Sequence, residues 1–201
     1  MDSSELTPGV QTFVGLHQAA RIVGGWCWAE QRCFEVLGGW VRDTSDPAAK
    51  RLLAIHSRHH AWRAQRWAEL LPRAYSASPE ELSSSPGPVD QTVFEELDRL
   101  ATVGRRMQGH YHEVYPALLR AYQTSPVVMS PLSDAPALRA IRIILSDGQH
   151  DLAEGRALIS KLDRGISDPD HLTQLQQALA KTQVKAHESG HLATVFNRWG
   201  A

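Results

Sequence analysis

The sequence has few of the features that mark secreted, membrane-bound or nucleic-acid-binding proteins. Only two cysteines, Cys27 and Cys33, occur in 201 residues. Six positions apart on a helix they face different directions, so neither a disulfide nor a paired-cysteine zinc motif is expected. No apolar run approaches the roughly 20 residues of a membrane span, and the N-terminus lacks the basic and apolar regions of a signal peptide. With a net charge of -1, nucleic-acid binding is not favoured. A cytoplasmic protein that binds neither membranes nor nucleic acid is predicted.

Strand-like alternation is also missing, whereas apolar residues recur at helical spacing along the chain. The length suits a single domain over residues 1–201. The predicted fold is all-α, with two antiparallel helical hairpins and a C-terminal helix. The expected helices cover about residues 9–43, 47–71, 90–123, 136–163 and 169–198.

Histidine and tryptophan are unusually frequent, with ten and six residues, and three of the ten histidines lie close together. His56, His59 and His60 fall in the middle of the expected helix over 47–71, within or beside its apolar face. Imidazole ligates metals and moves protons near neutral pH. The pattern therefore predicts that this helix supplies one side of a metal site inside a helical bundle.

The number of residues that separates each position from its hairpin turn predicts which residues lie opposite these histidines. Glu30 lies about fifteen residues before the turn near residue 45, and His59 and His60 lie about as far after it, so they should share a level. In the second hairpin, Glu113 lies seventeen residues before the turn near residue 130 and Asp147 lies seventeen residues after it, so these two should also share a level. Glu30 also lies in an apolar stripe, where a carboxylate is costly unless it is paired or bound to metal.

Two pairs at three-residue spacing complete the pattern. His56 and His59 form one pair, and Asp147 and His150 form the other, so each pair places two donor groups on one helix face.

Together these residues resemble the ferritin-like di-iron carboxylate superfamily. Its four-helix bundle supplies one carboxylate from each of two helices and a Glu-x-x-His pair from each of the other two. Asp147-Gly-Gln-His150 matches one pair with Asp in place of Glu, and His56 stands where the other pair has Glu. The similarity covers about residues 9–163. It implies the metal ligands Glu30, His56, His59, His60, Glu113, Asp147 and His150.

The resemblance also implies a function. A ferritin-like site of this kind would hold two metal ions, iron by preference, with zinc or manganese as the other options. Such a protein would be a non-haem oxygenase or oxidase, for example a monooxygenase, that activates O₂ to oxidise a small organic substrate. The sequence leaves a homodimer open.

Other residues could take the place of some of these metal ligands, and two other functions stay open. His110 lies closer to an apolar stripe than Glu113, and Asp151 points further inward than Asp147. Histidines at i and i+4 in the last expected helix, combined with a histidine of the 47–71 helix, resemble DinB-type bundles, which would imply a metal-dependent transferase or hydrolase. A non-catalytic metal-binding helical protein is the third option. The three-histidine set would be His60, His187 and His191.

Overall fold

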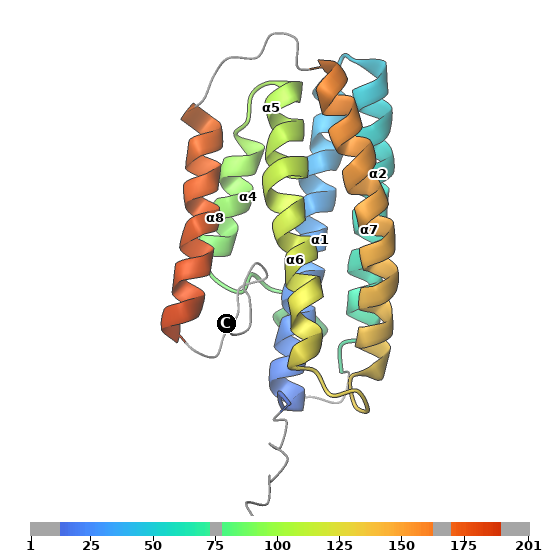
Figure 1. Cartoon of the computed structure of the whole chain (residues 1–201), viewed down its shortest axis with the longest axis vertical. Helices are drawn as coiled ribbons and strands as arrows, with labels where there is room; N and C mark the ends of the chain where they lie inside the picture. The colour runs from blue at the N-terminus through green and yellow to red at the C-terminus, as the bar shows by residue number, and fades with distance from the viewer. Residues whose placement is uncertain (1–12, 73–77, 163–169, 190–201) are drawn as a thin grey trace, which may run out of the picture.

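A computed structural model of the chain describes residues 13–72, 78–162 and 170–189, and its regular elements in these ranges are all helices (Figure 1). The predicted all-α class is therefore confirmed. Within the same ranges, no helix combines the length and apolar character needed to cross a bilayer.

The first two helices form an antiparallel hairpin. Helix α1 spans Leu16–Asp43 and α2 spans Pro47–Glu69. Both predicted helices are confirmed, although residues 13–15 precede α1 and residues 70 and 71 follow α2 outside the helix. The Asp46 carboxylate accepts a hydrogen bond from the backbone N–H of Ala49 at 2.7 Å. A proline in the first turn completes this start signal for α2.

The chain then crosses back along the bundle before the next long helix. Within this connection lie the short helix α3 (Pro79–Leu82) and helix α4 (Pro88–Asp98). The Ser78 hydroxyl accepts from the backbone N–H of Glu81, and the Glu81 carboxylate accepts from that of Ser78. This capping box starts a short helix between the helices expected over residues 47–71 and 90–123.

The prediction of one continuous helix over residues 90–123 is wrong. Helix α4 ends at Asp98, and a new helix, α5 (Val103–Gln108), starts after Thr102, whose hydroxyl accepts a hydrogen bond from a backbone N–H of its first turn. Leu100, between them, is fully buried. Good helix formers fill this stretch, so the break reflects tertiary packing and a capping side chain overriding local propensity.

A π-helical turn follows α5 directly. This turn, η1 (Gly109–Val114), leads into α6 (Tyr115–Thr124), and the backbone N–H of Tyr115 donates to the carbonyl of His110, five residues earlier. Pro116 comes next and has no N–H for a regular helical bond. The wider turn accommodates this missing donor.

The long helices are arranged in an up, down, down, up order. In Figure 1, α1 and α7 (Ala135–Leu162) run from bottom to top, whereas α2 and the continuous α5–η1–α6 segment run from top to bottom. Helix α8 (Asp170–Ser189) packs against α4 and η1. Helix α7 confirms the prediction over 136–163, and the last expected helix is confirmed as far as residue 189.

Aromatic side chains fill the bundle around a polar centre. Trp26 packs on Trp67 and Tyr122 with ring centroids 4.9 and 5.2 Å apart. Buried polar groups need partners to offset lost hydration, and here they gather at mid-height of the bundle. The buried charged or titratable side chains at this centre are Glu30, His56, His60, Arg63, His110 and Asp151.

Candidate metal centre

Helix α2 supplies most of the polar centre. His56, His60 and Arg63 follow one another at four- and three-residue steps, and each is at most 1% exposed. Residues at these steps share a helix face. His59 falls at the edge of that face, with 38% of its side chain exposed. Two of the three clustered histidines therefore point into the bundle, and the third borders solvent.

An inner cluster consists of Glu30, Cys33, His60 and His110, all 0% exposed. Glu30 Oε2 lies 2.5 Å from His60 Nδ1, so Glu30 meets one of the two histidines whose level counting from the hairpin turn predicts. The Tyr122 hydroxyl donates to the other Glu30 oxygen at 2.6 Å. His60 Nε2 faces His110 Nε2 at 3.3 Å. The second and third long helical segments thus meet through two imidazole rings.

Burial controls protonation in the inner cluster. It raises the pKa of Glu30 to about 7, against the opposing effects of a nearby guanidinium and the tyrosine hydrogen bond. Burial also lowers the pKa of His60 and that of His110 well below the usual imidazole value. The pKa of the Cys33 thiol is raised by burial well above its usual value. Both histidines are therefore neutral at pH 7, the form that ligates metals.

An outer cluster consists of His56, His59, Asp151 and Glu154, from α2 and α7. Asp151 Oδ1 lies 3.0 Å from His59 Nδ1 and 3.6 Å from His56 Nε2. Glu154 Oε2 lies 3.2 Å from the same His56 nitrogen. The Glu154 side chain is 49% exposed. Solvent therefore reaches the outer cluster but not the inner one.

Arg63 lies between the two clusters and fixes one of the outer carboxylates. Its NH2 group donates to Asp151 Oδ2 at 2.5 Å, and its guanidinium lies 5.6 Å from the centre of the Tyr115 ring. Burial alone would raise the pKa of Asp151, but the charge and hydrogen bond of Arg63 outweigh it and lower the pKa. Asp151 is therefore ionised, with Oδ1 left turned toward the two histidines.

Two tyrosines of the third helical segment orient the histidine rings, and two glycines of α7 give these tyrosines room. The Tyr111 hydroxyl lies 2.8 Å from His56 Nδ1, and the Tyr115 ring stacks on a histidine of the inner cluster. A β-carbon at Gly155 would lie only 2.5 Å from Tyr111 Cγ, and one at Gly148 would lie 2.8 Å from the Tyr115 hydroxyl oxygen.

Three residues expected from the sequence to be ligands do not join either cluster. The Glu113 carboxylate accepts a hydrogen bond from Gln176 of α8 at 2.8 Å. Asp147 is exposed. The His150 side chain is 75% exposed, and its Nε2 lies 3.5 Å from a Glu154 oxygen.

The rival residues take the inward positions instead. His110 is fully buried and Asp151 is 2% exposed. A π-helical turn holds more residues than an α-helical turn, so the count that pointed to Glu113 fails where η1 begins. On α7 the face that packs against α2 includes Asp151 and not Asp147. The side chain of His187 and all of His191 lie outside the described residues.

Three members of the centre were not singled out by the sequence: Cys33, Arg63 and Glu154. Each lies three residues along a helix from a residue that was singled out, and such pairs share a helix face. Extending the search by one helical turn from each candidate would have found them. Their respective neighbours are Glu30, His60 and Asp151.

Two donor sets among the described residues can hold a metal ion, and in each the ligand atoms lie within 4.8 Å of one another. Bonds of about 2.0–2.2 Å to one ion hold neighbouring ligand atoms roughly 3.0–3.5 Å apart. The separations of 3.0 and 3.6 Å in the outer cluster and 3.3 Å in the inner cluster are close to this spacing. The sets are His56, His59 and Asp151, and Cys33, His60 and His110.

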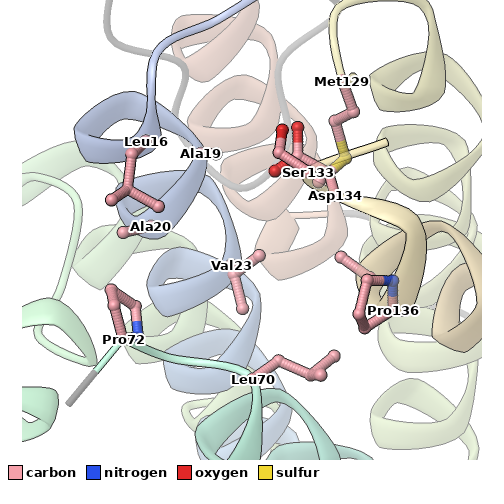
Figure 2. Close-up of a pocket in the computed structure, with 11 residues that line it drawn as sticks. Leu16, Ala19, Ala20, Val23, Leu70, Pro72, Met129, Ser133, Asp134 and Pro136 are labelled. Atoms are coloured by element: carbon pink, nitrogen blue, oxygen red, sulfur yellow. The ribbon is translucent and has the colours of Figure 1, made fainter. Parts of the chain in front are cut away.

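A separate apolar pocket lies at one end of the bundle (Figure 2). Leu16 and Val23 of α1, Leu70 beyond the end of α2, and Met129 and Pro136 around the start of α7 line it. The pocket shares no residue with either cluster.

Comparisons with protein-family models, with curated proteins and with solved structures give no significant match to this chain. The function proposed below therefore rests on the chain's own residues.

Proposed function

We propose that this chain is a non-haem metalloenzyme that uses O₂ to oxidise a small organic substrate at the outer cluster. The observation that carries the proposal is the donor set of His56, His59 and Asp151 at the solvent-reachable edge of the bundle. Two histidines and one carboxylate, with coordination positions left open, are typical of non-haem iron(II) oxygenases. Iron is accordingly the proposed ion, with zinc or manganese as the alternatives.

Neighbouring residues support this assignment by orienting the donors. Tyr111 holds His56 through Nδ1, which leaves Nε2 directed at the cluster, and Arg63 holds one oxygen of Asp151 and leaves the other directed at both histidines. Such partners of metal ligands fix ring orientation and tune affinity. A bound iron ion would supply the redox chemistry that no side chain of this set provides.

The surroundings of the outer cluster favour an apolar substrate. Ile55 and Trp62 lie one turn before and one turn after His59 on α2, so the three share a face. Their side chains are 40% and 43% exposed. The half-exposed carboxylate of Glu154 offers a group that can exchange protons with solvent beside this apolar rim.

The bundle is further proposed to be ferritin-like. The up, down, down, up order of its long helices, with one long crossover between α2 and α5, supports this arrangement. The π-helical turn at the centre supports a functional site, because such turns are frequent at functional sites.

Metal content of the full chain tests the proposal. The protein is purified without a His tag from iron-replete cells, and iron is measured per chain. Nitric oxide then reports by electron paramagnetic resonance whether the iron has an open position. The expected result is iron with an open position in the wild type, and loss of both iron and signal in His59→Ala and Asp151→Asn.

Matched controls come from the same helix. Asp147→Asn and His150→Ala change the same residue types on the exposed side of α7 and should retain iron. Iron lost from these two variants but kept in Asp151→Asn would overturn the assignment in favour of the ligand set expected from the resemblance. Metal lost on His187→Ala but kept in His59→Ala would overturn it in favour of a three-histidine site.

A further inference from the structure

We infer that the inner cluster is a second and closed metal site, in which Cys33, His60 and His110 bind a thiophilic transition-metal ion. Each of the three is 0% exposed. They come from α1, α2 and the π-helical turn, so the ion would tie three helical segments together at the middle of the bundle. This site goes beyond the proposed function and does not depend on it.

The facing imidazoles are the first reason. His60 and His110 approach each other through their Nε2 atoms at 3.3 Å. Two nitrogens bound tetrahedrally to one ion at about 2.0–2.1 Å lie roughly 3.3–3.4 Å apart. Two ring nitrogens that face each other can share at most one proton, whereas an ion between them accepts both lone pairs. The His110 Nδ1 atom has no hydrogen-bond partner in the described part of the chain, so Nε2 is the nitrogen through which this ring interacts.

The thiol of Cys33 supplies the third donor. Its sulfur and one ring nitrogen of each histidine lie within 4.8 Å of one another, so each sulfur–nitrogen distance need shorten by no more than about 1.3 Å to reach the roughly 3.5 Å that shared ligation requires. A thiol gives up its proton when it binds a metal ion. One thiolate and two imidazoles form a donor set that selects copper or zinc over the hard cations that prefer oxygen ligands.

The surroundings of His60 complete the site. Glu30 accepts from His60 Nδ1, and the Tyr122 hydroxyl holds the other Glu30 oxygen, while Trp67 Nε1 donates to the same hydroxyl at 3.2 Å. A carboxylate behind a ligating histidine fixes the ring tautomer and strengthens the ligand. No solvent reaches these residues, so the site has no place for a substrate, and its proposed role is to hold the bundle together.

Cobalt(II) is the probe for this site, because a thiolate bound to cobalt gives a charge-transfer absorption band. The metal-free full chain is titrated with cobalt. The expected result is a thiolate band that saturates at one ion per chain and disappears when zinc is added. Cys33→Ser should lose the band and weaken cobalt binding at this site by at least about tenfold.

Cys27→Ser is the matched control. Cys27 is an equally buried cysteine of α1, but its thiol donates to the Ala64 carbonyl at 3.3 Å and belongs to neither donor set. This variant should keep the band, and so should His59→Ala, which removes a partly exposed ligand of the outer cluster alone.

Absence of the band in the wild type would overturn the inference whatever the variants do, and so would a band that persists in Cys33→Ser. These outcomes are distinct from failure of the proposed function, because iron content and the nitric oxide signal report on the outer cluster and do not involve Cys33.

Discussion

Replacement of Gly155 by alanine is the sharpest test of how the fold positions the outer cluster. The new β-carbon would lie 2.5 Å from Cγ and 2.6 Å from Cε1 of the Tyr111 ring, about 0.9 Å closer than ordinary contact. Tyr111 is fully buried, so its ring has no free space to enter. The ring must shift, and its hydroxyl must move away from His56 Nδ1, which it now approaches to 2.8 Å.

The size of the effect follows from two opposing terms. Overpacking of a tight core costs about 1–3 kcal/mol, whereas alanine in place of glycine within a helix stabilises by about 1 kcal/mol. A net loss in the free energy of unfolding of about 1 kcal/mol is therefore expected. Metal affinity should suffer more, because loss of the partner that orients a ligating histidine weakens binding by roughly 10–100-fold.

The assay pairs urea unfolding with iron titration of the folded protein. Gly39→Ala is the control, because a β-carbon at Gly39 of α1 meets nothing within 4 Å, and it should stabilise the protein by about 0.5–1 kcal/mol without changing iron affinity. If Gly155→Ala binds iron as tightly as the wild type, then Tyr111 does not position His56 and this part of the reasoning is refuted.

Three further variants test other parts of the structure. Gly24→Ala would place a β-carbon on the backbone carbonyl of Leu82, so a loss of about 2–3 kcal/mol is expected in urea unfolding, and wild-type stability would contradict the packing of α3 on α1. Arg63→Met should cost about 3–5 kcal/mol by leaving the Asp151 carboxylate buried without its counter-charge, and full recovery is expected in the double variant Arg63→Met/Asp151→Leu. In metal-free protein, burial keeps the pKa of His110 well below its usual value, so only the unfolded chain gains this proton below about pH 6.5 and stability falls as the pH drops. His110→Gln should reduce the slope of unfolding free energy by up to about 1.4 kcal/mol per pH unit between about pH 6 and 5, and an unchanged slope in urea unfolding across this range would count against a buried neutral imidazole.

Local sequence signals were sufficient to predict the two helices of the first hairpin. Asp46 and the proline after it fix where α2 starts. Counting residues from that turn places Glu30 at the level of His59 and His60, and the structure brings it to His60. The two helices are regular and the turn between them is short, so residue positions convert directly into levels along the hairpin. Apolar residues at helical spacing predicted the extent of α7 in the same local way.

Counting residues from a turn predicted the wrong inward-facing residue where the helix is irregular. The third long segment is interrupted after Asp98 and contains a π-helical turn at Gly109–Val114. Neither feature follows from residue spacing, because the break depends on tertiary packing around Leu100 and on the Thr102 cap, and the wide turn accompanies Pro116. His110 and Glu113 lie three positions apart in this turn, so an error in helical phase is enough to choose the wrong one of the two. Which of several polar residues faces inward therefore depends on packing against the other helices.

The polar centre as a whole is better explained by function than by stability. Buried ion pairs and polar networks can often be replaced by apolar residues with no loss, or with a gain of about 1–4 kcal/mol. This bundle already buries an extensive apolar core, including Trp26, Trp67 and Tyr122. Its centre nevertheless holds Arg63 and Asp151 as a buried ion pair, with Arg63 Nε and NH1 lacking hydrogen-bond partners among the described residues. An arrangement that costs stability, and that turns histidine, thiol and carboxylate donors toward common points, favours metal binding as the reason these residues occupy the core.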